Sequence, residues 1–166
     1  RWHHQLESYR LKAYEKQLAS RWQGDLWAIS SGDANLWTSD RRMLVIPPLA
    51  DMKLAVKPCE ALPDQPVLLV HGKFSVDENR SAVLAVIQRA ESLMRYDVQV
   101  MGHGLDASLV DSLVGIPHMT YVDSPSDAEL HKALSTAHVV LVHANHALGV
   151  KLKLLHGMVR GGHVLA

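Results

Sequence analysis

Two lysines near the carboxy-terminal end of the sequence lie in a run that otherwise has the pattern of a buried helix. The run is GVKLKLLHGMVRGGHVLA, in which one leucine separates Lys151 from Lys153. At about 100° per residue, an apolar face is predicted for Leu154, Leu155, Met158 and Val159, and a polar face for Lys153, His156 and Arg160. Lys151 falls on the apolar side if the helix already includes it, and an unpaired charge there is costly. It therefore sits in the loop at Gly149, points at an anion, or extends along the helix end into solvent.

Three predicted strands end in loops that contain glycine, histidine or both. The loops are HGKFS, GHGLD and ANHALGVK, and they follow the runs VLLVHG, DVQVMG and HVVLVHA. Ligands of open parallel sheets bind at the carboxyl ends of the strands, and helix N-termini there favour phosphate. His71, His103 and His143 lie near these strand ends, where each is either a ligand contact or a structural histidine. The loops are thus candidate phosphate sites.

Several site classes lack their characteristic motifs. Neither G-x-G-x-x-G nor G-x-x-x-x-G-K-[ST] occurs, which argues against a standard NAD site and an ordinary nucleotide triphosphatase. His143 and His146 have neither the i, i+4 spacing nor the cysteine partners typical of zinc sites. The 17 basic and 17 acidic residues balance, so no global field favours nucleic acid.

The composition is that of an ordinary globular protein, with 48% apolar and 20% charged residues. We find no apolar run of about 18 residues and no signal-peptide pattern. The single cysteine, Cys59, is compatible with a reducing compartment. A cytoplasmic protein without a membrane-spanning segment is therefore expected.

The hydrophobic periodicity predicts two domains. A helix from Arg1 to Ser20 and short strands at residues 26–30 and 43–48 make up the first, residues 1–62, which ends in a proline-containing linker. In residues 63–166, strands alternate with helices, and the S-x-x-E patterns at Ser75 and Ser126 predict capping boxes. This alternation predicts an α/β fold with a doubly wound, mostly parallel sheet.

The closing run resembles the donor-site segment of GT-B glycosyltransferases of the family-4 (group 1) class, many of which carry G-I-K-x-K-x-L-E-A-M. ESYRLKAYEKQL, LWAISSGDANLW and LVIPPL are similar to the end of the amino-terminal domain in a bacterial subgroup of these enzymes. VLLVHGKFSVDENRSAV resembles the start of their carboxy-terminal domain. The resemblance implies Rossmann-like domains of GT-B type, incomplete at both ends. Residues 1–62 would end the first domain, and residues 63–166 would form a truncated nucleotide-sugar-binding domain.

The same resemblance implies a set of site residues. Gly72 and Lys73 would lie near the donor diphosphate, and Gly149, Lys151 and Lys153 would form the donor loop and helix start, with Lys73 and Lys151 as catalytic residues. His156 and Leu148 stand where the wider class has the two glutamates of E-x7-E, so both glutamates are missing. The lysines would stabilise the charge of the leaving diphosphate, and His156 would face the ribose or base.

The implied activity is transfer of a sugar, with retention, from a nucleoside-diphosphate-sugar donor to a saccharide or other acceptor. No metal or other cofactor is expected, because the nucleotide-sugar is a substrate. We expect the 166-residue chain alone to be inactive. The alternative is a non-catalytic GT-B-like domain that serves as a binding or scaffold module, which the missing glutamates favour and the retained K-x-K disfavours.

Overall fold

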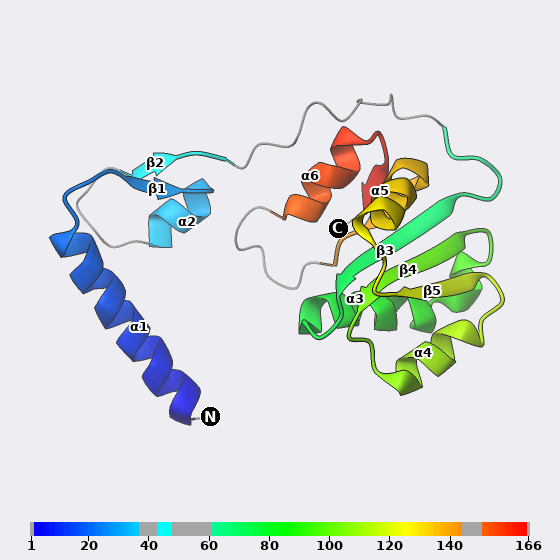
Figure 1. The fold of residues 1–166 in the computed structure, drawn as a ribbon, viewed down its shortest axis with the longest axis horizontal. Coiled ribbons are helices and arrows are strands. Elements are labelled where there is room, and N and C mark those ends of the chain that lie inside the picture. The colour runs from blue at the N-terminus through cyan, green and yellow to red at the C-terminus, as the bar shows by residue number, and fades with distance from the viewer. Residues whose placement is uncertain (1, 37–42, 48–60, 144–150, 166) are drawn as a thin grey trace. The chain divides into compact units, whose positions relative to one another are not determined.

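The computed structural model of the chain describes residues 2–36, 43–47, 61–143 and 151–165 (Figure 1). These residues belong to two compact units, the first within residues 2–47 and the second within residues 61–165. Across the described ranges, no helix is both long and apolar enough to cross a membrane.

The first unit contains a long helix and a small parallel β-α-β arrangement. Its elements are α1 (Trp2–Arg21), β1 (Leu26–Ala28), α2 (Ser31–Leu36) and β2 (Met43–Val45). The long amino-terminal helix predicted from the sequence is confirmed. Its apolar side chains Leu11, Tyr14 and Leu18 are exposed, so they do not form a core face of the unit.

The second unit is built on a five-stranded parallel sheet with the strand order β5-β4-β3-β6-β7. The strands are β3 (Val67–Lys73), β4 (Asp97–His103), β5 (Met119–Asp123), β6 (Val139–Leu141) and β7 (His163–Leu165). The first four residues of the central strand β3, VLLV, are all apolar, as expected for a strand covered on both faces. The predicted α/β fold with a parallel sheet is confirmed.

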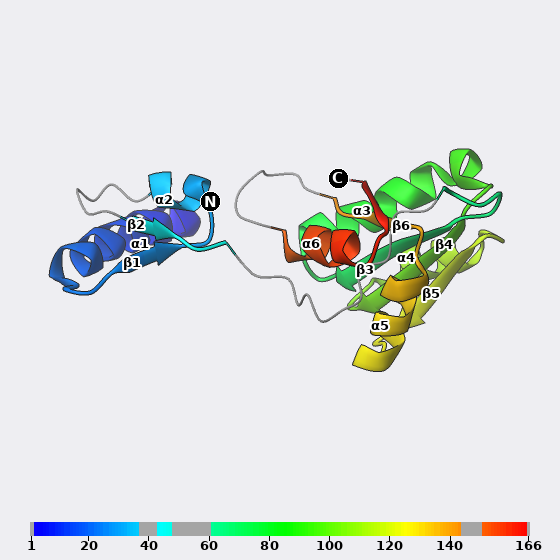
Figure 2. The same ribbon diagram turned by 90° about the horizontal axis from the view of Figure 1, so that it is seen from above.

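Helices cover both faces of this sheet, as Figure 2 shows for α3 and α5. The covering helices are α3 (Asp77–Gln88), the 3₁₀ turn η1 (Ala90–Leu93), α4 (Ala107–Val114), α5 (Asp127–Thr136) and α6 (Leu152–Val159). One core cluster joins Leu68 and Val70 of β3 to Val83 of α3 and Leu113 of α4. The other joins Leu69 to Leu134 of α5 and Leu154 of α6. The alternating side chains of β3 thus serve two cores.

The order in which the chain adds strands to the sheet reverses between β3 and β6, although the two strands are parallel. From β3 the chain moves outward to β4 and β5, then crosses back to β6 on the other side of β3. A crevice forms outside the carboxyl ends of the strands at such a reversal, and ligands of open α/β sheets bind there. The residues that follow β3 and β6 therefore border the most probable ligand position of this fold.

One of the two predicted capping boxes is present and the other is wrong. Before α5, the Ser126 hydroxyl accepts from the Glu129 N–H while the Glu129 carboxylate accepts from the Ser126 N–H. At α3 the N-cap is Val76, with no side-chain cap bond. The Val76 N–H donates to the carbonyl of Lys73 in a turn directly after β3. This turn moves the helix start past Ser75 and leaves the Glu78 carboxylate to face another partner.

Helix α6 packs against the sheet through a glycine. Gly157 is buried, and a Cβ built on it would lie 2.9 Å from Cγ2 of Val164 and 3.3 Å from Cβ of Val140. Leu154 packs beside it, whereas Met158 is 57% exposed. The apolar face predicted from helical periodicity is therefore rotated, because the close approach at Gly157 decides which side meets the sheet.

We expect Gly157→Ala to lower the free energy of unfolding, because the stiff valine side chains cannot move aside. Overpacking costs about 1–3 kcal/mol, against a gain of about 1 kcal/mol in helix propensity, so the net loss should be about 1 kcal/mol. Urea denaturation measures it. Gly162→Ala is the control, since its Cβ would lie no closer than 3.5 Å to any neighbour. Equal stability of the two variants would contradict the packing argument.

Candidate anion-binding site

The carboxyl end of β3 turns at a glycine that leaves no room for a side chain. Gly72 has a φ of +149°, a backbone conformation that favours glycine. A Cβ there would lie 2.5 Å from Nζ of Lys153 and 3.0 Å from Nδ2 of Asn79. In the adjacent strand, Gly102 is paired with Gly72, and a Cβ on Gly102 would collide with the Gly72 carbonyl oxygen. Side chains from α6 and α3 occupy the space that the missing side chain of Gly72 leaves.

Lys153, near the start of α6, is fixed by two neutral acceptors. Its Nζ donates to the carbonyl oxygen of His71 at 2.7 Å and to Oδ1 of Asn79 at 2.6 Å. Nδ2 of Asn79 in turn donates to the carbonyl oxygen of Lys73 at 2.8 Å. Burial lowers the pKa of Lys153, the Glu78 carboxylate raises it, and the Lys151 charge lowers it again. An ammonium has three N–H donors, so one remains after these two bonds.

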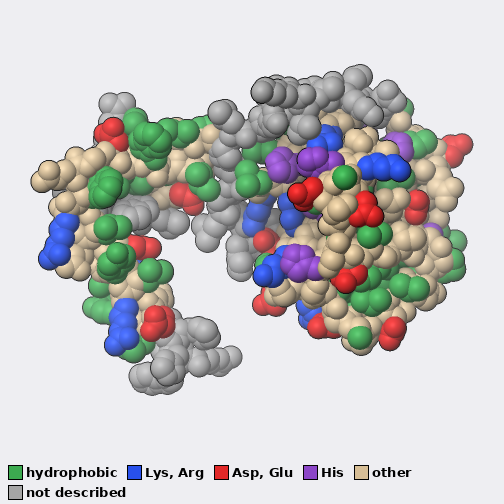
Figure 3. All heavy atoms as spheres, viewed as in Figure 1, with side chains coloured by type: hydrophobic (Ala, Val, Ile, Leu, Met, Phe, Trp, Pro, Cys, Tyr) green, Lys and Arg blue, Asp and Glu red, His purple; other side chains and the backbone are tan. Residues whose placement is uncertain are grey.

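Lys151 lies one residue before α6 and forms an ion pair across the end of the sheet. Its Nζ donates to Oε1 and Oε2 of Glu78 in α3, at 2.8 and 3.0 Å. The two side chains are 30% and 29% exposed. Lys151 is the N-cap residue of α6 and lies outside the helix, so it does not fall on the apolar face. Figure 3 shows basic and acidic side chains next to one another between α3 and α6.

His71 is buried beside this cluster, with 8% of its surface exposed. It shares a strand face with Leu69, which packs toward α5 and α6. Its Nε2 is buried and has no hydrogen-bond partner within the described ranges. Burial, then the charges of Lys153 and His156, lower its pKa to about 4. His71 is therefore neutral at pH 7, and the positive charge of the site comes from the lysines.

The structure brings together three of the site residues expected from the sequence, Gly72, Lys151 and Lys153. The Lys73 side chain is exposed at the strand end, and only its carbonyl oxygen takes part in the cluster. His156 is exposed on α6, close enough for its charge to lower the pKa of His71. Gly149 lies outside the described residues.

Glu78 and Asn79 hold the two lysines, and neither is among the site residues expected from the sequence. A carboxylate and an amide are ordinary residues at a helix start, so their types carry no specific signal. The usable signal is positional. Both α3 and α6 begin at the carboxyl side of β3 and β6, so polar residues of their first turns meet at the reversal of the strand order.

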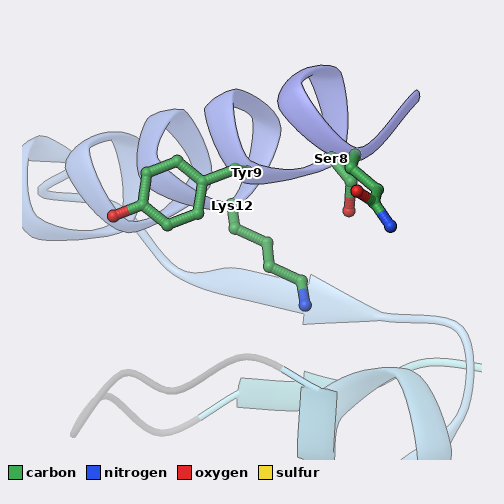
Figure 4. Close-up of a pocket in the computed structure, with 4 residues that line it drawn as sticks. Ser8, Tyr9 and Lys12 are labelled. Carbon is green, nitrogen blue, oxygen red and sulfur yellow. The ribbon is translucent and has the colours of Figure 1, made fainter. Parts of the chain in front are cut away.

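A shallow hollow on α1 is a weaker candidate for a binding site. It is lined by Gln5, Ser8, Tyr9 and Lys12, and Figure 4 shows these side chains along one helix. All four are exposed and come from a single element, whereas binding sites enclose most of a ligand's surface. Among the described residues, no group of three or more His, Cys, Asp or Glu could hold a metal ion.

Comparison with known proteins does not assign the chain to a family. No protein-family model matches the sequence, and no curated protein matches it.

The depressed pKa of His71 predicts a pH-dependent stability. Between about pH 6.5 and pH 4, His71 binds a proton in the unfolded chain but not in the folded chain. The contribution of His71 should therefore be complete above pH 6.5 and decrease as the pH falls toward 4. The loss should be on the order of 3 kcal/mol. Urea denaturation of the natural chain and of His71→Leu at several pH values measures it. Parallel pH profiles for the two would show that His71 does not titrate as described.

Replacing Gly72 by alanine should disturb both the backbone and Lys153. We expect Gly72→Ala to lower the free energy of unfolding by about 1–3 kcal/mol, because a side chain at this φ is strained. It should also displace the Lys153 ammonium, which the new Cβ would crowd. Urea denaturation reports the first effect, and a changed Lys153 Nζ signal in NMR reports the second. Gly162→Ala serves again as control, and an unchanged Nζ signal would contradict the crowding.

Proposed function

We propose that the second unit binds a nucleoside-diphosphate-sugar as the donor-binding domain of a GT-B-type glycosyltransferase, which transfers the sugar to an acceptor with retention. The observation that carries the proposal is the fixed Lys153 ammonium beside Gly72 at the reversal of the strand order. A cation held there, next to the backbone of a glycine, is suited to bind a phosphate group. The family resemblance of the LGVKLKLLHGMVRGGHVLA run supports the same ligand class.

The arrangement suits departure of a diphosphate. When the bond between the anomeric carbon of the sugar and the diphosphate oxygen breaks and the acceptor oxygen bonds to that carbon, negative charge develops on the leaving phosphate oxygen, and a positioned cation stabilises it. Lys153 is held by two acceptors before any ligand arrives, so little reorganisation is needed when that charge develops. In this proposal Lys151 adds a second cation, and His156 lies farther along α6 on the ribose or base side.

A non-catalytic binding module is the second candidate function. The observation in its favour is the ion pair of Lys151 with Glu78, which engages one of the two lysines without any ligand. A module of this kind would keep the fold and the pair as structure and would not respond to nucleotides.

A melting experiment separates the two functions. We expect one of UDP, GDP, dTDP or ADP to raise the melting temperature of the chain, while inorganic phosphate at the same concentration does not. At about 100 times the dissociation constant the stabilisation is about 2.7 kcal/mol. That corresponds to about 5–10 °C for a chain of this size.

The variant Lys153→Met should abolish this rise, because it keeps the apolar stem and removes the charged donor. The loss should be about 1.5–3 kcal/mol of binding free energy for each charged hydrogen bond. Lys132→Ala removes an equal charge from the exposed side of α5 and should leave the rise unchanged. If none of the four nucleotides shifts a cooperative melt, the donor site is wrong and the binding module is favoured.

A further inference from the structure

The two lysines of the site differ in what balances their charge. Lys153 donates to a backbone carbonyl and to an amide oxygen, both neutral groups. Lys151 donates to both oxygens of the Glu78 carboxylate. The three charged groups therefore sum to one positive charge, carried on the Lys153 side. No carboxylate of the described residues is hydrogen-bonded to Lys153, whereas Lys151 is paired with one.

The Glu78 carboxylate is in a position to be exchanged. Lys151 and Glu78 are 30% and 29% exposed, so water reaches both ends of the pair. Separating such a pair costs little, since partly exposed ion pairs contribute little to stability, whereas splitting a fully buried pair costs several times more. A carboxylate and a phosphate also present the same kind of oxygen acceptor to an ammonium.

The position of Glu78 suggests which ligand group replaces it. Lys151 and Lys153 are close enough that the charge of one lowers the pKa of the other. A ligand with one phosphate can bind the remaining donor of Lys153 and leave the ion pair intact. A ligand with two linked phosphates offers a second anionic group to the same pair of cations, and that group competes with Glu78 for Lys151.

From this arrangement we infer that Glu78 is a built-in competitor of the second phosphate of a diphosphate ligand, released from Lys151 when the ligand binds. The inference rests on the proposed function and adds a specificity-determining residue to it. Glu78 weakens the binding of every anionic ligand that needs Lys151, and it does not affect the binding of ligands that need only Lys153. The site thereby discriminates between ligands by the number of linked phosphates. It also discriminates by whether the other contacts of the ligand offset the free-energy cost of separating Glu78 from Lys151.

The test uses Glu78→Gln with pyrophosphate and inorganic phosphate as probes. Isothermal titration at constant ionic strength should show pyrophosphate binding about two- to fivefold more tightly to the variant than to the natural chain, as expected for removal of a partly exposed ion pair. Phosphate affinity should not change. Asp77→Asn is the matched control, because it removes the same charge from the same first turn of α3 at an exposed position. It should behave as the natural chain does with both probes.

Equal pyrophosphate affinity of Glu78→Gln and Asp77→Asn would overturn the exchange, and so would weaker binding by Glu78→Gln, which would make Glu78 a positioning residue for Lys151. If nucleoside diphosphates stabilise the natural chain while Glu78→Gln brings no gain, the exchange is wrong and the donor site remains. If pyrophosphate binds only Glu78→Gln and no nucleoside diphosphate stabilises the natural chain, the exchange holds and the proposed function fails. Absence of pyrophosphate binding in all three chains, together with no stabilisation by nucleoside diphosphates, would refute both.

Discussion

The first turn of α3 and the start of α6 are joined by hydrogen bonds across the carboxyl end of β3, and the candidate site depends on this junction. The two helices lie on opposite faces of the sheet and belong to different core clusters. Lys153 meets Asn79 in the space beside Gly72, the penultimate residue of β3, and Lys151 meets Glu78 next to it. With a side chain at position 72, the ammonium of Lys153 could not reach the carbonyl oxygen of His71. The strand end, both helix starts and the charges of the site thus form one unit.

Desolvation and charge pairing act in opposite directions within this unit. Burial lowers the pKa of Lys153, and the Glu78 carboxylate partly restores it. His71 lacks such a compensating carboxylate, and its pKa falls to about 4. The protein therefore keeps its positive charge where oxygen acceptors surround it and excludes charge from the imidazole under α6.

The sequence predicted the sheet better than the site. Continuous apolar runs such as VLLV, and their alternation with helices, depend on local periodicity, so the parallel α/β fold and the capping box at Ser126 could be predicted. The box at Ser75 failed because a turn after β3 delays the helix start, and such a turn leaves no mark in the periodicity. The face of α6 was predicted with the wrong rotation, because the contact of Gly157 with Val140 and Val164 is a tertiary contact. The partners of the lysines lie more than seventy positions away, beyond the reach of any local pattern.

The crowding at Gly72 also restricts how the sequence can change in evolution. A side chain at position 72 is excluded by the strand's backbone conformation and by the ammonium and amide of Lys153 and Asn79. A larger residue at 72 therefore requires a shorter one at 153 or 79 and a relaxed turn at the same time. A chain with only one of these three positions changed loses either stability or the fixed cation. Over evolutionary time, positions 72, 79 and 153 should be inherited and lost together, as a single character of the chain.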